Sequence, residues 1–166
     1  MREIPLTTQG KIALVDDEDY DWLNQVGWYA YVDGKTFYAA RWVLSATTKT
    51  GRTVLRMHRA IMGLTDPKVQ VDHEDGNGLN NQRYNMRVAT PVQNGSNRRT
   101  GSNNTSGYKG VNWCGDRWRS RICVAGNRIE LGYFDDPTEA ATAYDEAALI
   151  HHGPFARLNL PKGANA

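Results

Sequence analysis

The apolar residues of the first part of the chain fall in short runs that predict strands. Residues 11–15 (KIALV) form one such run. Residues 28–44 (WYAYVDGKTFYAARWVL) predict two strands around an Asp-Gly turn, a dipeptide typical of tight hairpins. Between these runs, an acidic stretch places Tyr20, Leu23 and Val26 at helical spacing, which predicts a short helix.

Two further runs, residues 68–73 (KVQVDH) and 84–90 (YNMRVAT), flank a loop rich in glycine and asparagine. Both runs have the length and composition of strands. A helix is predicted to follow, because Thr90 suits the capping position, Pro91 the first helical position and Gln93 the reciprocal capping position. This segment therefore predicts strand, loop, strand and helix in succession.

A polar stretch precedes the last part of the chain. Residues 97–107 (NRRTGSNNTSG) contain no apolar residue, which is typical of a linker. Three strand-length runs follow, and then a helix is predicted from Asp136-Pro137 to Gly153, with small residues on the face that would lie against a sheet. The chain is predicted to divide into residues 1–50, 51–97, 98–106 (the linker) and 107–166.

Charge is distributed unevenly along an otherwise ordinary globular composition. The chain has 166 residues, of which 40% are hydrophobic and 23% charged, with a formal net charge of +2. Residues 51–106 carry eight Lys and Arg against four Asp and Glu, and residues 107–134 carry five against two. Local basic clusters of this kind are typical of polyanion binding. A solvated basic face is the alternative interpretation.

Several classes of protein are disfavoured by the sequence. The two cysteines, Cys114 and Cys123, cannot supply the ligands of a four-cysteine zinc site. No apolar run reaches the roughly 18 residues of a membrane span, and the N-terminal residues lack the apolar core of a secretory signal. We therefore expect a soluble, cytoplasmic protein without a membrane partner.

The stretch VDHEDGNGLNN, residues 71–81, carries the candidate chemistry. Asp72 and His73 adjoin at the end of a predicted strand, and Asn94 lies on the helix that follows. Carboxylate and amide oxygens suit a hard cation such as Mg²⁺, and an imidazole can accept a proton from water near neutral pH. A metal beside it can stabilise a phosphate oxygen and the leaving oxygen. The arrangement predicts hydrolysis of phosphodiesters.

The segments MHRAIMG, VDHEDGNGLNNQRYNMRVAT and PVQNGSNR, within residues 56–98, resemble the HNH endonucleases, also called His-Me finger or ββα-metal nucleases. The resemblance is greatest to the free-standing and intron-encoded homing enzymes of phages. It implies that His73 is the general base, that Asp72 binds the divalent metal and that Asn85 holds the histidine and its loop. Asn94 would be the second metal ligand, with Asn97 as second choice. The metal would be Mg²⁺ or another divalent cation such as Mn²⁺.

Other interpretations of these residues remain open at the level of sequence. A single histidine is commonly only hydrogen-bonded, and loops rich in asparagine and glycine are commonly only turns. The joint spacing favours the nuclease. His58 also belongs to the family pattern, and we expect it to pack beneath the site rather than to react.

The segments YKGV, LGYFDDPTEAATAYDEAA and GPFARLN, across residues 107–160, resemble the plant ethylene-response-factor (Apetala-two type) DNA-binding domain. The resemblance implies a three-stranded sheet that lies in the major groove of DNA. Strand alternation predicts that Arg119 and Arg121 face outward while Trp118 and Ile122 lie under the helix. Glu130 stands where the family commonly has an aromatic residue. The predicted DNA-binding residues are Lys109, Asn112, Trp113, Arg117, Arg119, Arg121 and Arg128.

The sequence as a whole predicts an α+β protein. It would have a β-rich N-terminal region, a ββα-metal HNH core and a C-terminal three-stranded antiparallel sheet packed on one helix. The expected function is divalent-metal-dependent endonuclease cleavage of double-stranded DNA, by nicking as a monomer or by double-strand cleavage as a homodimer. The alternative is a DNA-binding regulator that does not cleave.

Overall fold

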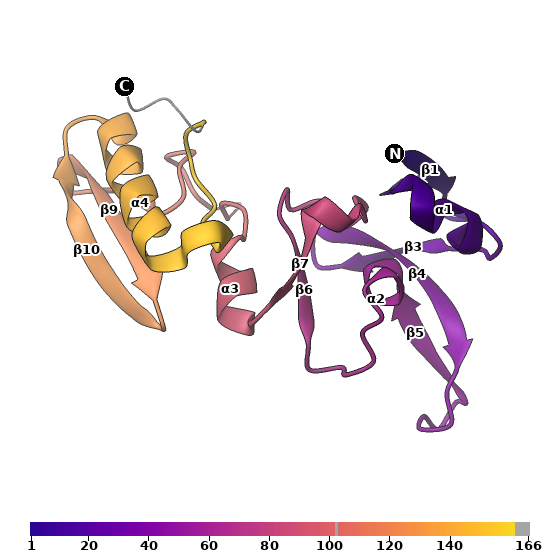
Figure 1. Ribbon diagram of the computed structural model, residues 1–166. Helices are drawn as coiled ribbons and strands as arrows, with labels where there is room; N and C mark the ends of the chain where they lie inside the picture. The colour runs from indigo at the N-terminus through magenta and orange to yellow at the C-terminus, as the bar shows by residue number, and fades with distance from the viewer. Residues whose placement is uncertain (102, 162–166) are drawn as a thin grey trace. The chain divides into compact units, whose positions relative to one another are not determined.

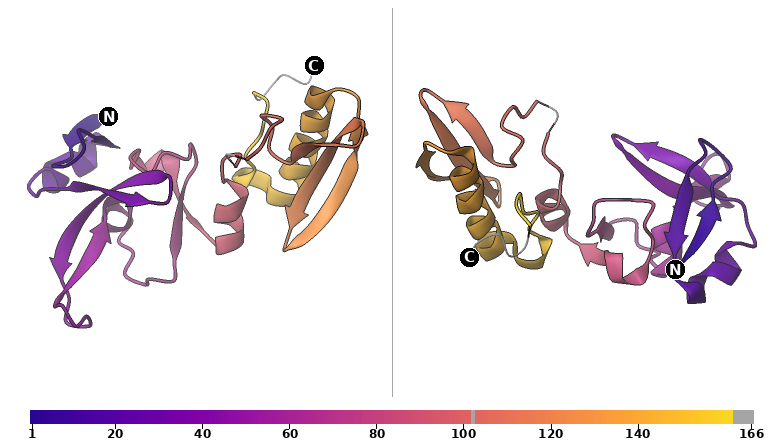
Figure 2. Two further views of the ribbon diagram at one scale, coloured as in Figure 1. Left: turned by 180° about the vertical axis from the view of Figure 1, so that it is seen from behind. Right: turned by 90° about the horizontal axis from the view of Figure 1, so that it is seen from above.

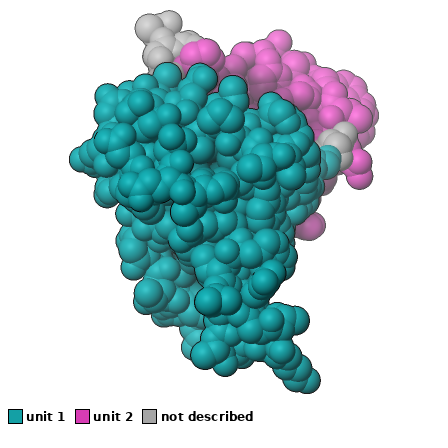
Figure 3. Space-filling model, turned by 90° about the vertical axis from the view of Figure 1, so that its right-hand side faces the viewer, with its two compact units in different colours: residues 1–90 teal, residues 91–166 magenta. Residues whose placement is uncertain are grey.

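The protein has an α+β fold that divides into two compact units. The structure is a computed structural model that describes residues 1–101 and 103–161. The first unit comprises Met1–Thr90 and the second Pro91–Ala166 (Figure 3). Each unit has its own antiparallel sheets and its own apolar core, and each is described by itself below.

The first unit contains three antiparallel sheets and two short helices among its described elements (Figure 1). A two-stranded sheet pairs β1 with β2, a three-stranded sheet has the order β3-β4-β5, and a second two-stranded sheet pairs β6 with β7. The bounds of these elements are β1 Arg2–Pro5, β2 Ile12–Val15, α1 Asp17–Leu23, β3 Tyr29–Asp33, β4 Thr36–Leu44, β5 Arg52–Arg56, α2 Met57–Ile61, β6 Gln70–His73, η1 Arg83–Asn85 and β7 Met86–Ala89.

One apolar core holds most of these elements together. It contains Trp28, which is 1% exposed, and buried side chains from β1, β2, α1, β3, β4, α2 and β7. The indole nitrogen of Trp28 donates to the carbonyl oxygen of Leu23 at 2.9 Å, so the largest buried side chain also meets its polar requirement. The first 50 residues and the segment around His73 therefore share a core.

Most predicted elements of this unit are confirmed. The hairpin around Asp33-Gly34, the strand before α1 and the strand that ends at His73 are all present. Strands β1 and β5 were not predicted. Helix α1 ends at Leu23, and Val26 lies outside it with 37% exposure, so the predicted helix was one turn too long.

The second unit consists of a three-stranded antiparallel sheet with one long helix against it, preceded by a short helix (Figure 1). The strand order is β10-β9-β8, and α4 contacts all three strands. The view from behind shows β9 and β10 side by side with α4 along one face (Figure 2). The bounds are α3 Pro91–Ser96, β8 Val111–Cys114, β9 Arg117–Val124, β10 Asn127–Phe134, α4 Pro137–His152 and η2 Gly153–Phe155.

The helix α4 begins and ends where the sequence predicted. The side chain of Asp136 accepts hydrogen bonds from the backbone of Thr138 and Glu139 at 2.6 and 3.2 Å, which satisfies two of the free N–H groups at the helix start. Small side chains of α4 bury its inner face, with Ala140 and Ala148 fully covered. They let the helix approach the sheet closely, as the alanine pattern indicated.

The C-terminal three-stranded sheet is therefore present as predicted. The β6–β7 hairpin and α3 follow one another in the order of a ββα motif, but α3 begins the second unit. The ββα-metal assembly, and the division into four parts, stay predictions. Among the described residues, no helix is both long enough and apolar enough to cross a membrane.

Candidate functional site

Asp72 and His73 form the end of β6, and both side chains are buried, with 4% and 5% exposure. Asp72 lies opposite Arg87 of β7. The guanidinium of Arg87 donates to Asp72 Oδ2 from Nε at 2.8 Å, and its Nη2 lies 2.7 Å from the same oxygen. This pairing offsets the cost of burying a carboxylate. It also fixes the orientation of Asp72 beside the histidine.

The imidazole of His73 is enclosed by side chains from three other segments. Its Nε2 lies 3.4 Å from Asn81 Oδ1. The ring centroids of His58 and Tyr38 are 5.2 and 5.9 Å from that of His73. Burial lowers the pKa of His73 below 6.5, although the Asn81 hydrogen bond and the charges of Asp75 and Asp72 oppose this effect. His73 is therefore neutral at pH 7 and able to accept a proton.

His58 of α2 packs edge-on against His73 and is 4% exposed. Burial, together with the neighbouring His73, Arg56 and Arg59, lowers the pKa of His58 to about 3. Its Nδ1 has no hydrogen-bond partner among the described residues. The side chain lies against His73, where the sequence led us to expect a packing role.

Asn85 fastens the loop that follows His73. Its Nδ2 donates to Asp75 Oδ1 at 3.1 Å and to the carbonyl of Asn80 at 2.8 Å, and its Oδ1 accepts from the backbone of Asp75 at 3.0 Å. The backbone of Glu74 donates to the Asn85 carbonyl at 2.8 Å. These bonds join both ends of the loop to one buried amide side chain.

The same loop is also fixed from the N-terminal side of the unit. Leu14 of β2 exchanges backbone hydrogen bonds with Leu79 and Asn81, each of 2.8 Å. A Cβ added at Gly78 would lie 2.5 Å from the carbonyl oxygen of Phe37 and 2.6 Å from the Tyr38 ring. The loop therefore lies directly on β4, and only a glycine fits at this position because it has no side chain.

Sequence reasoning missed four neighbours of the site: Tyr38, Arg56, Asn81 and Arg87. Arg56 lies over the Tyr38 ring at 5.1 Å from its centroid, and Arg87 grips Asp72. Tyr38 and Arg56 are far from His73 in the chain. Arg87 could have been inferred, because a hairpin of residues 70–73 with 86–89 places it opposite Asp72.

The predicted metal ligands come from different parts of the fold. Asp72 lies in the first unit, whereas Asn94 lies on α3 and Asn97 follows it in the second unit. Asn97 is buried, with 6% exposure. The described residues include no group of three or more His, Cys, Asp or Glu placed to hold a metal. The assignment of these amides as ligands stays a prediction.

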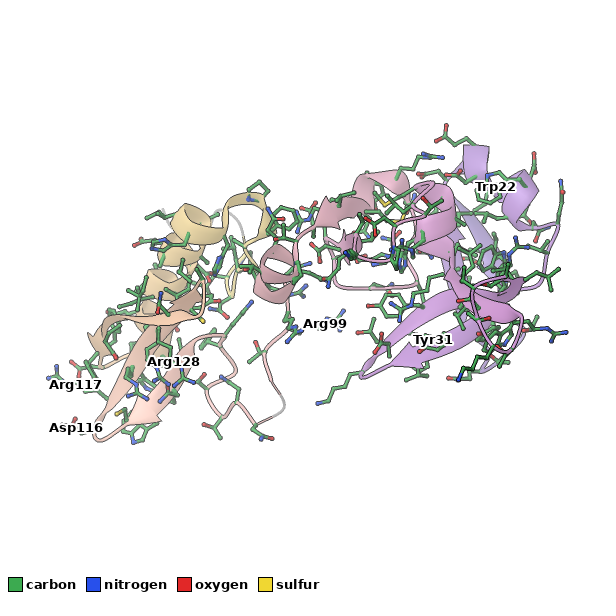
Figure 4. All side chains as sticks on the ribbon, turned by 90° about the horizontal axis from the view of Figure 1, so that it is seen from below. Trp22, Tyr31, Arg99, Asp116, Arg117 and Arg128 are labelled. Carbon is green, nitrogen blue, oxygen red and sulfur yellow. The ribbon has the colours of Figure 1, made fainter. Side chains whose placement is uncertain are left out.

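The predicted DNA-binding residues of the second unit mostly gather on one sheet face. The face opposite α4 carries Asn112, Arg117, Arg119, Arg121 and Arg128. Figure 4 labels Arg117 and Arg128 on this sheet. Arg121 Nη2 donates to Asn112 Oδ1 at 3.4 Å, and Arg119 Nε lies 3.9 Å from Glu130 Oε1. Ser120 and Ile122 are buried on the other face, as strand alternation predicted. We call the five residues the arginine face.

Two predicted contacts lie elsewhere. Trp113 is paired with Trp118, with ring centroids 4.9 Å apart, on the α4 side of the sheet. Lys109 extends its Nζ to the carbonyl of Ser96 on α3. Burial lowers the pKa of Lys109 to about 8, and the charge of Arg157 acts in the same direction. Neither residue joins the arginine face. Cys114 and Cys123 are free thiols.

Comparison with known proteins gives relatives for most of the chain. No protein-family model matches it. Protein 3.8 of Escherichia phage T7 is 33% identical over 112 residues, which cover 66% of this chain and 92% of the phage protein. The chain belongs to the family of phage T7 protein 3.8.

Two other similarities extend this result. A protein of Acanthamoeba polyphaga mimivirus, named as an uncharacterized HNH endonuclease, is 29% identical over 157 residues, which cover 91% of this chain and 76% of the viral protein. Dehydration-responsive element-binding protein 2D of Arabidopsis thaliana is 47% identical over 60 residues, or 33% of this chain and 28% of the plant protein. This member of the protein 3.8 family is therefore similar to a protein named as an HNH endonuclease and, over a shorter segment, to a plant protein named as element-binding.

Proposed function

We propose that this protein is a divalent-metal-dependent HNH endonuclease that hydrolyses phosphodiester bonds of double-stranded DNA. The observation that carries this proposal is the environment of His73. Its imidazole is buried and neutral at the end of a strand, next to a buried carboxylate, and a second imidazole packs against it. The similarity to a protein named as an HNH endonuclease supports the same reaction.

In the proposed reaction, His73 takes a proton from the attacking water. Asn81 orients its ring through the contact at Nε2, and Asn85 keeps the loop in the shape that holds Asn81. A bound Mg²⁺ or Mn²⁺ would stabilise charge on the phosphate and on the leaving oxygen. Asp72 and Asn94, with Asn97 as second choice, would hold it. The products would carry 5′-phosphate and 3′-hydroxyl ends, by resemblance to the family.

The donor chemistry fits such a cation. Mg²⁺ is commonly held by one or two protein oxygens together with water and substrate phosphate, rather than by a complete protein cage. Asp72 supplies a buried carboxylate, and Asn94 and Asn97 supply neutral amide oxygens. The described residues hold no group of three or more His, Cys, Asp or Glu placed to bind a metal, and this mode of binding does not require one.

The second unit would bind the DNA on which the first acts. Its arginine face carries four arginine side chains from two neighbouring strands on one side of the sheet. Arginine binds phosphates and guanine edges through paired N–H groups. The likeness to a plant protein named as element-binding supports DNA as the ligand. We infer that this unit supplies most of the affinity and the first unit supplies the chemistry.

Incubation with supercoiled plasmid tests the proposal. With Mg²⁺ the protein should convert supercoiled circles to relaxed or linear DNA, and a chelator should prevent this. Relaxed circles indicate nicking, whereas linear products at early times indicate double-strand cleavage. Plasmid that stays supercoiled while the protein binds it would instead support the regulator that does not cleave.

Substitution of the ligands tests the metal assignment. Asp72→Asn should raise the Mg²⁺ concentration needed for half-maximal nicking more than Asn94→Ala does, because the aspartate carries the charge. Asn97→Ala is the matched comparison. If Asn97→Ala shifts the Mg²⁺ midpoint and Asn94→Ala does not, the ligand role moves to Asn97.

A further inference from the structure

One face of the β3-β4-β5 sheet carries exposed side chains that the proposed reaction does not use. Side chains alternate along a strand, and directly paired residues share a face. Tyr38, Trp42 and Leu44 of β4 therefore lie on one face, with Tyr31 opposite Tyr38 and Arg52 opposite Leu44. Arg56 pairs with Ala40 on the same side. We call this set the β4 face: Tyr31, Tyr38, Trp42, Leu44, Arg52 and Arg56.

The β4 face is aromatic and apolar at its surface. Trp42 is 60% exposed and Leu44 is 87% exposed. Large apolar side chains that gather on one exposed face, rather than lying scattered, are typical of interaction sites. Figure 4 labels Tyr31 on this sheet. Exposed aromatic rings on a strand are the platforms on which nucleobases stack.

Cations are interleaved with the rings. The Arg56 guanidinium lies 5.2 Å from the Tyr31 ring centroid and 5.1 Å from that of Tyr38, and it pairs with Asp33 at 2.7 Å. Residues 29–56 carry five basic side chains and a single acid, whereas residues 1–28 carry two basic side chains and six acids. The five basic residues are Lys35, Arg41, Lys49, Arg52 and Arg56. Of these five, Arg52 and Arg56 lie on the β4 face, whereas Arg41 alternates to the opposite face and lies over the Trp28 ring. The strands that carry the β4 face thus form a locally basic segment of the first unit.

The β4 face is continuous with the candidate active site. The Tyr38 ring belongs to both, since its centroid lies 5.6 Å from that of His58 and 5.9 Å from that of His73. Trp42 is four residues further along β4, which is about 13 Å at 3.3 Å per residue. This equals about four base steps of duplex DNA at 3.4 Å per step. A strand whose phosphate reached His73 would have its neighbouring nucleotides over this face.

We propose that the β4 face binds the DNA next to the scissile phosphate, with Arg52 and Arg56 holding phosphates and Trp42 stacking on a base that has left the duplex stack. An apolar patch without concentrated positive charge would favour a protein partner. Here the local excess of basic side chains favours a polyanion instead. The inference rests on the proposed function, from which it takes DNA as the ligand.

Binding by the full chain tests this face against a matched control. A fluorescent duplex with a short single-stranded gap is titrated in chelator, so that no cleavage occurs, and anisotropy gives the Kd. Trp42→Ala should raise the Kd about tenfold, since stacking on one base is worth about 1–3 kcal/mol. Arg52→Ala should raise it less and should reduce its salt dependence.

The controls remove the same residue types from the acidic side of the same unit. Trp22 on α1 is 43% exposed and donates to Asp19, and Arg2 pairs with Asp21. Figure 4 labels Trp22 on α1, apart from the sheet that carries Tyr31. Trp22→Ala and Arg2→Ala should leave the Kd within about twofold of the parent. Circular dichroism melting of each variant verifies that it is folded.

Each outcome separates this inference from the proposed function. If Trp42→Ala and Trp22→Ala have equal Kd values and the parent protein nicks plasmid, the proposed role of the β4 face is overturned and the proposed nuclease function is not affected. A parent that neither binds nor cleaves DNA overturns both. Loss of self-association in Trp42→Ala with unchanged DNA affinity assigns the face to a second copy of the chain and overturns the proposal. A selective loss of affinity in Trp42→Ala and Arg52→Ala supports it.

Discussion

At the scale of single residues, the sequence singled out a candidate reactive pair and one of its neighbours, His58, but not the other side chains that surround the pair. Asp72 and His73 were singled out because a carboxylate and an imidazole adjoin at a strand end. Their environment comes from Tyr38, His58 and Arg87, which lie on other elements. Contacts between residues distant in the chain depend on how strands and helices pack, and spacing in a sequence does not encode that packing.

His73→Ala should abolish most cleavage while leaving DNA binding intact. The imidazole is proposed to activate water and is almost fully buried, so it has little surface with which to hold DNA. Loss of general-base assistance typically costs about 10²–10⁴ in rate. Plasmid nicking and gel shift measure the two effects, with His151→Ala on the exposed end of α4 as control. Nicking at the parent rate would move the base to another residue.

The buried histidines should make the protein less stable as the pH falls. In the unfolded chain His58 takes up a proton near pH 6.5, whereas burial lowers the pKa of folded His58 to about 3. Between these values the unfolded state binds more protons, so the free energy of unfolding decreases with falling pH. The full contribution is present above pH 6.5 and is lost progressively down to about pH 3.

Comparison of the parent with His58→Gln isolates this effect. Carboxylates also titrate toward the acid end of the window, but they are common to both proteins. The variant should lose less thermal stability than the parent between about pH 6.5 and 5, as judged by the change in Tm. The slope should not vanish, because burial also lowers the pKa of His73. Equal slopes in the two proteins would contradict a neutral, buried His58.

At the scale of elements, periodicity predicted strands and faces better than it predicted close approaches. Alternation along β9 correctly separated Ser120 and Ile122 from the arginine face. Strand β1 was missed because it is four residues long and ends in Pro5, and β5 because it begins and ends with arginine. The pattern predicted a loop rich in glycine but not that the missing side chain of Gly78 lets this loop lie on β4.

Gly78→Ala should destabilise the first unit. Its Cβ would lie 2.5 Å from a backbone oxygen and 2.6 Å from the Tyr38 ring, so the loop or the strand must move. Overpacking of this kind costs about 1–3 kcal/mol. Gly95→Ala is the control, because its Cβ meets nothing within 4 Å and lies in the helix α3, where alanine is favoured by up to about 1 kcal/mol. Thermal melting should show a lower Tm than that of the parent for Gly78→Ala but not for Gly95→Ala.

At the scale of the whole molecule, charge separates the proposed tasks more clearly than hydrophobicity does. The net charge of +2 gave no indication of a partner, but its local distribution did. The basic segment after residue 106 folds into a sheet whose outer face carries four arginines. Both units have ordinary apolar cores, and nothing in those cores distinguishes a catalytic unit from a binding unit. The surface side chains carry that distinction.

Arg117→Ala with Arg128→Ala should weaken DNA binding without lowering the thermal stability. Both residues are exposed, and the pair of Arg117 with Asp135, at 3.4 Å on the surface, stabilises little. If each arginine neutralises one phosphate, the slope of log K against log salt should become shallower by about 2, since each contact releases about 0.9 counterions. Anisotropy titrations at several salt concentrations measure this slope, and Arg2→Ala in the acidic region of the first unit is the control.

The cleavage rate at saturating DNA should stay near that of the parent, because the arginine face is proposed to hold the substrate while His73 is proposed to activate the attacking water. An unchanged slope in the double variant would exclude these two arginines from the DNA contact, and a fall in the saturated rate alone would contradict the division of tasks between the two units.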